Sequence, residues 1–324
     1  MGQIDRRSFL RHTAAAGAAI VAARGPAFAE EAVPNSSGTE APKLKVPVGA
    51  CDCHHHIYDA KFPFSRPGAR MIANARVGDY RALQRRLGLT RNIVVTPAPY
   101  PATAADNLVT IDALAAFGPN ARGVAIVSPG ITDGELRSLA DGGVRGVRFS
   151  LAGSGASPPI SAQTVAEIDA LSKRVNELGW HVQFNIDAAQ IAAIQDLLDR
   201  LPATIVIDHM GHMPQPVGID DPAFGIVRKL IDKGRTWVKL SVTYDSSKVG
   251  PPTYTDVNKV GAAYVQAARE RLVWGSNWPH PNETAKPDDA AVFDLLAAWA
   301  PSEAVRRRIL VENPEALYGF AKIT

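Results

Sequence analysis

The sequence predicts an α/β protein folded as a (β/α)8 barrel, the TIM-barrel architecture, and three observations support this. Eight short runs rich in β-branched residues alternate with longer runs that repeat with the period of an α-helix. About 280 residues follow an N-terminal leader, which is enough for one such barrel. The first strand ends in histidines. A doubly wound open sheet would also alternate strands and helices, but it usually has a glycine-rich nucleotide loop after its first strand.

The strands are expected where apolar, β-branched residues cluster, at residues 49–56, 92–96, 123–127, 146–150, 181–185, 204–208, 237–241 and 272–275. Helical patterns lie between them, including those at residues 78–87, 107–117, 161–178, 188–200 and 223–233. Glycines stand where several of these helices should end, at positions 88, 118, 179 and 234. The alternation therefore continues along most of the chain.

Residues 1–29 are predicted to be a twin-arginine signal peptide. Arg6 and Arg7 precede a short apolar run over residues 13–23, and residues 27–29 (AFA) supply the small side chains of a cleavage site. This run is shorter than the roughly 20 residues that span a bilayer. We therefore expect a periplasmic protein that uses the twin-arginine export machinery, with no membrane span in the mature chain.

The charge of the leader also bears on the partners of the mature protein. Its four arginines and one aspartate account for the whole net charge of +3. The rest of the chain is neutral overall, so it has no basic field to attract nucleic acid, and we expect a small-molecule substrate. Residues 30–45 are polar and are predicted to be a flexible linker, and residues 46–324 are predicted to form the barrel domain.

The first predicted strand carries the densest group of reactive side chains. Alternate residues of a strand share a face, which separates two sets: Asp52, His54 and His56 on one side, and Cys51, Cys53 and His55 on the other. We expect the first set to face the mouth of the barrel and the second to pack against helices. His54 and His56 would then act as catalytic groups or bind a metal.

The fourth and fifth strands supply candidates for substrate binding. Arg148 lies inside an apolar strand, where a guanidinium needs an anionic partner. That partner is either a substrate carboxylate or an internal salt bridge. On the fifth strand Gln183 and Asn185 share the face of His181 and lie nearer the mouth, so we expect them to contact substrate. His181 is interpreted as a buried, hydrogen-bonded histidine.

The later strands add the remaining candidates. His209 ends the sixth strand as a third catalytic imidazole, and Asp208 could orient it. Tyr244 follows the seventh strand and could reach the substrate. Asn277 and His280 follow the eighth strand, and the Asn277 amide can donate and accept hydrogen bonds but cannot act as a base at neutral pH.

These residues lie in motifs that resemble those of the amidohydrolase superfamily, in the branch of lactonases that are similar to pyrone-dicarboxylate lactonase. The motifs are CDCHHHIYD, VRGVRF, VIDHMGH, LVWGSNWPHP and ILVENPEALYGF, and they extend over residues 48–320. Within this branch the sequence most resembles the galactarolactone isomerases. The resemblance implies a (β/α)8 enzyme and identifies the branch, not the substrate.

The resemblance also implies roles for individual residues. His54 and His56 match the first-strand HxH, Arg148 matches an arginine that binds a substrate carboxylate, and His209 matches the sixth-strand histidine. Asn277 stands where metal-dependent members, and the pyrone lactonase, have an aspartate. The fifth strand also lacks a histidine at its mouth. Three imidazoles, those of His54, His56 and His209, remain as potential zinc ligands, and no cofactor is favoured.

The sequence therefore predicts an enzyme that acts on the carbonyl of a small sugar-acid or dicarboxylate lactone, as a lactonase or a lactone isomerase, without an essential metal. Arg148, the imidazoles and the Asn277 amide would stabilise the oxyanion, and His54 or His56 would carry the proton. Two alternatives remain open. One is a zinc-dependent amidohydrolase or decarboxylase, and the other is a non-catalytic periplasmic binding protein.

Overall fold

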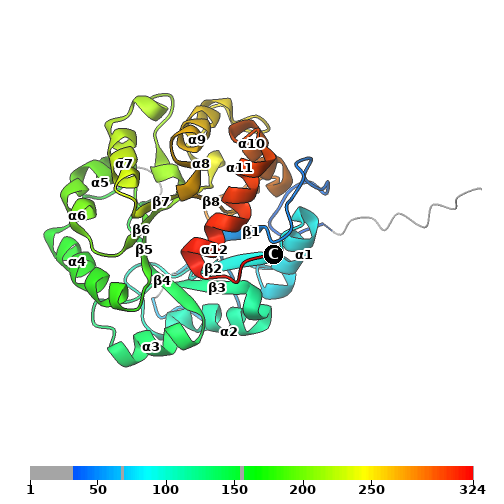
Figure 1. Ribbon diagram of the computed structural model, residues 1–324. Coiled ribbons are helices and arrows are strands. Elements are labelled where there is room, and N and C mark those ends of the chain that lie inside the picture. The colour runs from blue at the N-terminus through cyan, green and yellow to red at the C-terminus, as the bar shows by residue number, and fades with distance from the viewer. Residues whose placement is uncertain (1–31, 67–68, 154–156, 324) are drawn as a thin grey trace, which may run out of the picture. The chain divides into compact units, whose positions relative to one another are not determined.

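The computed structural model describes residues 32–66, 69–153 and 157–323. The predicted signal peptide lies outside these residues, so export remains a prediction. Eight strands form one parallel sheet in the order β1 to β8, and helices surround it (Figure 1). The predicted (β/α)8 barrel is confirmed.

All eight predicted strands are present in the structure. They are β1 (Cys51–His55), β2 (Arg91–Val95), β3 (Ala121–Ala125), β4 (Val144–Ser150), β5 (His181–Asn185), β6 (Thr204–Ile207), β7 (Thr236–Leu240) and β8 (Leu272–Trp274). Each strand pairs in parallel with the next along the chain, and nearly every residue of these strands is buried. This burial on both faces explains why the strands appear in the sequence as short, continuous apolar runs.

The helices follow the predicted pattern. They are α1 (Val77–Leu87), α2 (Leu108–Phe117), α3 (Asp133–Asp141), α4 (Ala162–Glu177), α5 (Ala188–Ala193), α6 (Gln195–Arg200), α7 (Pro222–Asp232), α8 (Thr243–Ser246), α9 (Thr255–Ala268), α10 (Asp289–Trp299), α11 (Glu303–Arg307) and α12 (Asn313–Tyr318). The single helix predicted at residues 188–200 is divided into α5 and α6, because Ile194 leaves the helical conformation. No helix within the described residues is long and apolar enough to cross a membrane.

The two ends of the barrel differ. At the amino ends of the strands, α12 lies across the ring of strands (Figure 1), and Tyr318 and Phe320 pack among interior residues such as Ile93. Arg91, the first residue of β2, donates to Glu315 of α12 at 2.8 Å. The amino end is therefore filled by side chains, which leaves the carboxyl ends of the strands to form a site.

The join between the last strand and the first positions several candidate residues. The Asn277 backbone N–H donates to the carbonyl of His54 at 2.7 Å, and the His56 N–H donates to the carbonyl of Trp278 at 2.8 Å. The segment after β8 is thus hydrogen-bonded to the end of β1. This brings Asn277 next to the two histidines.

The predicted orientation of residues 51–53 is wrong. Cys51 and Cys53 belong to the cluster of side chains inside the barrel. Asp52 points outward and accepts a hydrogen bond from Tyr80 of α1 at 3.0 Å. The cysteines therefore occupy the interior position that strict alternation gave to Asp52.

A β-bulge explains this error. The pairing of β1 with β2 shifts register between Asp52 and His55, so one extra residue is accommodated there. As a result His54 and His56 both point inward, as predicted. His55 points outward and stacks on Tyr80 with ring centroids 3.5 Å apart, also as predicted.

The described part of the predicted linker, residues 32–45, packs against the barrel instead of extending freely. The Trp278 indole donates to the carbonyl of Pro34 at 2.7 Å, and the Leu44 N–H donates to Asp294 at 2.9 Å. Arg86 of α1 donates to the carbonyl of Glu40 at 2.9 Å. Polar composition suggested a free segment, but its backbone groups have found partners on the barrel.

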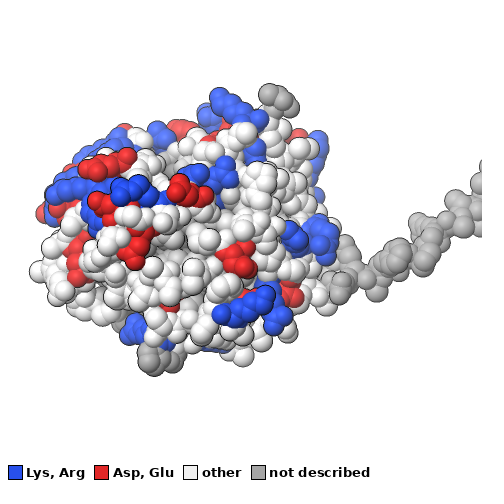
Figure 2. Space-filling view, turned by 90° about the horizontal axis from the view of Figure 1, so that it is seen from below, with Lys and Arg blue, Asp and Glu red and all other residues white. Residues whose placement is uncertain are grey.

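On the face shown in Figure 2, basic and acidic side chains are interspersed around a largely uncharged area. No side of this face is dominated by one sign of charge.

Candidate active site

A cavity of about 1040 Å³ opens at the carboxyl ends of the strands. Seven of the nine predicted site residues line it, namely His56, Arg148, Asn185, His209, Tyr244, Asn277 and His280. The other two, His54 and Gln183, are fully buried and are not among the lining residues. They lie in a layer beneath the cavity and cannot contact substrate in this arrangement.

Asp208 is the centre of this buried layer. Arg148 Nε donates to its Oδ2 at 2.8 Å, Gln183 Nε2 donates to the same oxygen at 3.0 Å, and Lys239 Nζ lies 3.6 Å from Oδ1. Burial alone would raise the pKa of Asp208, but the positive charges of Lys239 and Arg148 hold it well below its usual range. Asp208 is therefore a carboxylate with permanent counter-charges.

Lys239 is a residue that the sequence analysis missed. Its side chain is completely buried, and Nζ donates to Gln183 Oε1 at 2.7 Å and to His54 Nδ1 at 3.3 Å. The signal was available, because Lys239 interrupts an apolar strand just as Arg148 does. A charge in such a strand indicates a buried partner.

Both first-strand imidazoles have close polar partners at their ring nitrogens. His56 Nδ1 lies 2.8 Å from the Val95 carbonyl, which only accepts, so Nδ1 carries the proton. His54 Nδ1 lies 3.3 Å from the Lys239 ammonium, which only donates, and 3.4 Å from Asp208 Oδ1, which only accepts, while His54 Nε2 lies 3.3 Å from His56 Nε2. Every nitrogen of the two rings is thus in contact with a protein group.

These imidazoles are poor bases at neutral pH. Burial, assisted by the charge of Arg148, lowers the pKa of His56 to about 3. Burial and the Lys239 charge hold the pKa of His54 well below its usual range. Both rings are therefore neutral hydrogen-bonding groups at neutral pH.

Three of the predicted site residues have the left-handed backbone conformation that non-glycine residues rarely adopt. The φ angles are 52° at His209, 61° at Asn277 and 54° at His280. Such strain is retained where the surrounding structure enforces it, and it is concentrated at functional sites. His209 Nδ1 also lies 2.8 Å from the Ser241 hydroxyl, which holds the ring while its other edge faces the cavity.

One wall of the cavity carries three polar side chains in a line, and a fourth, Asp289, is buried behind them. Asn277 Nδ2 donates to the Tyr244 hydroxyl at 2.9 Å, and that oxygen lies 2.9 Å from His280 Nδ1. His280 Nε2 lies 3.1 Å from Asp289 Oδ2. Asp289 was missed by the sequence analysis, since it lies within a helix and not at a strand end.

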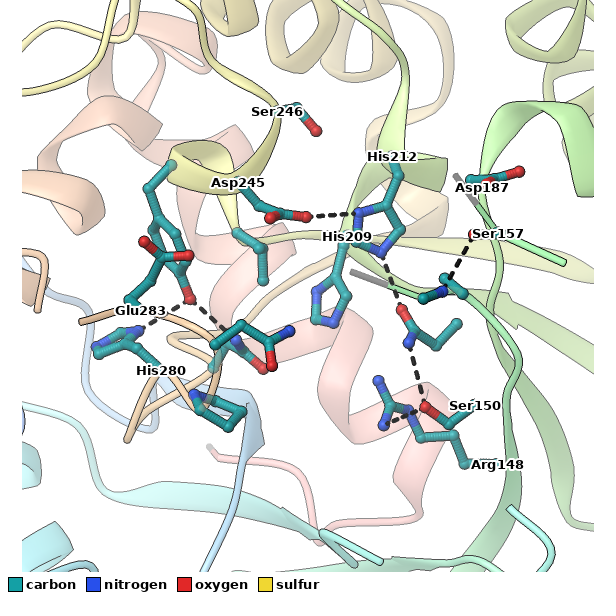
Figure 3. A pocket seen from close by; sticks show the side chains of 18 of the residues that line it. Arg148, Ser150, Ser157, Asp187, His209, His212, Asp245, Ser246, His280 and Glu283 are labelled. Carbon is teal, nitrogen blue, oxygen red and sulfur yellow. Dashed lines mark hydrogen bonds and ion pairs between the residues drawn. The ribbon is translucent and has the colours of Figure 1, made fainter. Parts of the chain in front are cut away.

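The opposite wall is a second polar chain, and Figure 3 shows two of its members, Ser150 and His212, on the far side of His209 from His280. Asn185 Nδ2 donates to the Ser150 hydroxyl at 3.2 Å, and His212 Nε2 lies 2.9 Å from Asn185 Oδ1. The other nitrogen of His212 lies 3.2 Å from Asp245. With Arg148 at its base (Figure 3), this wall offers donors to an anionic, oxygen-rich substrate.

The residues that could hold a metal differ from the predicted set. His54, Asp208 and His209 have potential ligand atoms within 4.8 Å of one another, and imidazole with carboxylate suits zinc. However, the Lys239 ammonium contacts His54 Nδ1 at 3.3 Å and Asp208 Oδ1 at 3.6 Å. A divalent cation would face this positive charge, so the arrangement does not fit a metal while Lys239 keeps these contacts.

A parallel barrel that gathers imidazoles, carboxylates and an arginine at the carboxyl ends of its strands belongs to the general class of TIM-barrel enzymes. The comparison with protein families narrows this class. Residues 51–320 match the model of the amidohydrolase family, and the chain belongs to that family.

Two curated relatives cover most of the chain. The sequence is 33% identical over 288 residues to a 2-pyrone-4,6-dicarboxylate hydrolase of Comamonas testosteroni, covering 86% of this chain and 92% of that protein. It is 34% identical over 298 residues to a D-galactarolactone isomerase of Agrobacterium fabrum, covering 90% and 98%. Among solved structures, an apo crystal structure from Agrobacterium tumefaciens superposes with a TM-score of 0.76 at 32% identity, covering 87% of this chain and all of that one.

Proposed function

We propose that this protein is an enzyme that attacks the ester carbonyl of a small lactone bearing a carboxylate, and that it does so without a metal ion. One observation carries the proposal, namely that Arg148, His209 and Asn277 converge on one cavity at the catalytic end of the barrel. The relatives named as a lactone isomerase and a pyrone-dicarboxylate hydrolase support the same chemistry. Their activities also favour an enzyme over a binding protein.

In the proposed reaction an oxygen nucleophile adds to the lactone carbonyl, and negative charge develops on the carbonyl oxygen. Arg148 binds the substrate carboxylate through the guanidinium N–H groups that Asp208 does not use. His209 and Asn277 face the same space and can donate to the oxyanion, and one such donor is worth about 3 kcal/mol. Attack by water opens the lactone, and attack by a hydroxyl of the substrate yields an isomeric lactone.

A proton-NMR assay tests this proposal directly. D-galactarolactone and 2-pyrone-4,6-dicarboxylate are incubated with the protein, with and without EDTA, and the products are identified as open acids or as isomeric lactones. We expect turnover of at least one of them that EDTA does not reduce. Failure to turn over either lactone would contradict the proposed function.

A matched pair of variants on β4 tests the role of Arg148. Arg148→Lys keeps a positive charge beside Asp208 but loses the planar fork that binds a carboxylate. Its KM should rise tenfold or more, the equivalent of losing one charged hydrogen bond of about 1.5–3 kcal/mol. Arg145→Lys is the control, because Arg145 donates to the backbone carbonyls of Ala140 and Val144 and does not line the cavity.

A zinc-dependent hydrolase is the second candidate, and the proximity of His54, Asp208 and His209 favours it. Metal analysis of protein purified without chelator separates the two candidates. One zinc per chain, together with loss of turnover in EDTA, would establish the zinc enzyme and refute the metal-independent one.

We also propose that the protein is exported to the periplasm by the twin-arginine machinery, on the basis of Arg6 and Arg7. Replacing both with Lys should leave the precursor in the cytoplasm, as measured by cell fractionation. Normal periplasmic accumulation of the variant would contradict this assignment.

A further inference from the structure

Asp289, His280 and Tyr244 form a line of hydrogen bonds that leads from a buried carboxylate to the cavity. Asp289 Oδ2 lies 3.1 Å from His280 Nε2, and His280 Nδ1 lies 2.9 Å from the Tyr244 hydroxyl. Asp289 and His280 are each only 1% exposed, and His280 and Tyr244 line the cavity whereas Asp289 does not. The order of groups is acid, imidazole and hydroxyl, which is the order that activates a hydroxyl in many hydrolases.

The chemistry of the partners fixes the direction of these hydrogen bonds. The Asp289 carboxylate can only accept, so His280 Nε2 carries the proton and Nδ1 presents a lone pair. Tyr244 then donates its hydroxyl proton to Nδ1 and accepts a hydrogen bond from Asn277 Nδ2 at 2.9 Å. A second lone pair of the Tyr244 oxygen remains for a group in the cavity.

Asp289 has one close side-chain partner that can become positively charged, and one oxygen that is free of hydrogen bonds. His280 is the one basic side chain within ion-pair distance of Asp289 among the described residues, and Asp289 Oδ1 is buried there without a hydrogen-bond partner. A buried carboxylate is stabilised when the group beside it becomes charged. Asp289 is also the first residue of α10, where the helix dipole stabilises its negative charge.

We propose that Asp289, His280 and Tyr244 act as a proton relay that deprotonates the attacking oxygen, a task that the Asn277 amide cannot perform. This inference rests on the proposed lactone chemistry. The incoming hydroxyl or water transfers its proton to the Tyr244 oxygen as its own oxygen bonds to the carbonyl carbon, and the carbonyl π electrons move to the oxyanion. At the same time the Tyr244 proton moves to His280 Nδ1.

The second half of the reaction reverses these transfers. When the tetrahedral intermediate collapses, the bond from carbon to the ring oxygen breaks. His280 returns its proton to Tyr244, and Tyr244 protonates the leaving oxygen. No proton, oxidant or other co-reactant is left over, and the Asp289 carboxylate stays ionised throughout. Tyr244 is the catalytic residue in this scheme, and His280 and Asp289 act through it.

Three variants test the relay on the lactone that the wild-type protein turns over. Tyr244→Phe removes the hydroxyl, His280→Asn keeps a hydrogen-bonding group but cannot take the proton, and Asp289→Asn removes the charge. Each should lower kcat by about a hundredfold or more, the range of general acid–base catalysis. KM should change by no more than about threefold, because the interaction is made in the transition state.

The control is Tyr100→Phe, which removes a tyrosine hydroxyl that donates to Glu167 at 2.9 Å and lies outside the cavity lining. It should leave kcat unchanged. The double variant Tyr244→Phe with Asp289→Asn should be no slower than the slower single variant, because the three groups act as a unit. Additive losses, or losses that appear in KM alone, would overturn the relay.

A second measurement needs no substrate. In the full chain with ¹⁵N-labelled histidine, the His280 signals are assigned by their absence in His280→Asn. We expect Nε2 to be protonated and Nδ1 to be unprotonated. A ring protonated at Nδ1 cannot accept from Tyr244 and would refute the relay. This measurement tests the relay even if the protein turns over neither lactone. Absence of turnover would refute the proposed function, whereas a proton on His280 Nδ1 would refute the relay.

Discussion

Two regions of the site are each built around a buried aspartate, but the partners of the two aspartates differ. One is the floor, the buried layer beneath the cavity, and the other is the wall that carries Asn277, Tyr244 and His280. Asp208, in the floor, is surrounded by the guanidinium of Arg148 and the ammonium of Lys239. Asp289, behind the wall, has only the imidazole of His280 as a cationic partner within the described residues. The first carboxylate always has counter-charges, and the second gains one only when His280 takes up a proton.

This difference assigns different tasks to two similar carboxylates. A carboxylate with permanent counter-charges holds its neighbours in place, and its charge is unavailable for stabilising a new cation. A carboxylate beside a neutral imidazole can stabilise the imidazolium that forms during proton transfer. The floor is therefore expected to contribute mainly to stability, and the wall mainly to turnover.

Asp208→Asn should produce the largest loss of stability. It leaves Lys239 and Arg148 buried together without their counter-charge, and breaking a buried pair in this way costs about 3–5 kcal/mol. Urea denaturation followed by circular dichroism measures the free energy of unfolding. The matched variant Asp289→Asn still accepts from neutral His280 and should lose only about 1 kcal/mol. Equal losses would remove the contrast between the two aspartates.

Lys239→Met should convert the floor into a metal site. Without the ammonium, His54 Nδ1 and Asp208 Oδ1 become available beside His209. The variant itself should be less stable. Zinc at a hundredfold its Kd should restore about 2.7 kcal/mol to the free energy of unfolding. The control is Lys233→Met, which removes an exposed lysine paired with Asp199. Calorimetric titration that shows one tight zinc in the wild type would contradict a metal-free floor.

The case of Lys239 shows how far sequence reasoning extends. The eight strands were predicted because apolar β-branched runs are distinct, and Arg148 was found as a charge inside such a run. The same rule applied to the run Thr236–Leu240 would have found Lys239 as well. The ion pair between Arg148 and Asp208 could not be predicted from the sequence. It depends on which side chains of β4 and β6 lie at the same height inside the barrel.

Two other features had no signal in the sequence. The bulge in β1 places Cys53 and His54 both inside the barrel, and a one-residue irregularity is invisible to a rule of strict alternation. The contact of Tyr244 with His280 joins residues 36 apart through two loops, so it depends on the backbone path after β7 and β8. Tyr244 and His280 were each predicted to contact substrate from their residue type and position. Their hydrogen bond to each other, on which the relay depends, could be found only in the structure.

Asn277→Asp tests how the wall depends on the donor beside Tyr244. A carboxylate at this position would accept the Tyr244 proton and draw it away from His280, and it would add negative charge near the oxyanion. Turnover should fall by about a hundredfold, as for the loss of an oxyanion-hole donor. The control is Asn176→Asp, on the exposed side of α4. A rise in zinc content together with metal-dependent hydrolysis would show instead that Asn277 replaces a metal ligand.

Asp52 extends the comparison to a third buried aspartate, and its substitution should have the smallest effect. Asp52 is held by neutral donors alone, the hydroxyls of Ser276 and Tyr80 at 2.6 and 3.0 Å and the N–H groups of Ser276 and His54 at 3.0 Å. Burial outweighs these donors and raises the pKa of Asp52 to about 6, so its charged form is weakly favoured at neutral pH.

In Asp52→Asn the remaining carbonyl oxygen can still accept from the two N–H groups, and both hydroxyls can turn to accept from the new amide. The free energy of unfolding should therefore fall by only about 1 kcal/mol, the value of one hydrogen bond. Turnover should stay within about threefold of the wild type, because Asp52 points away from the cavity and carries no proton in the proposed reaction. Urea denaturation and lactone kinetics on this variant, run beside Asp208→Asn, give the comparison. If Asp52→Asn lost as much stability as Asp208→Asn, the buried counter-charges around Asp208 would not explain the large cost of replacing it.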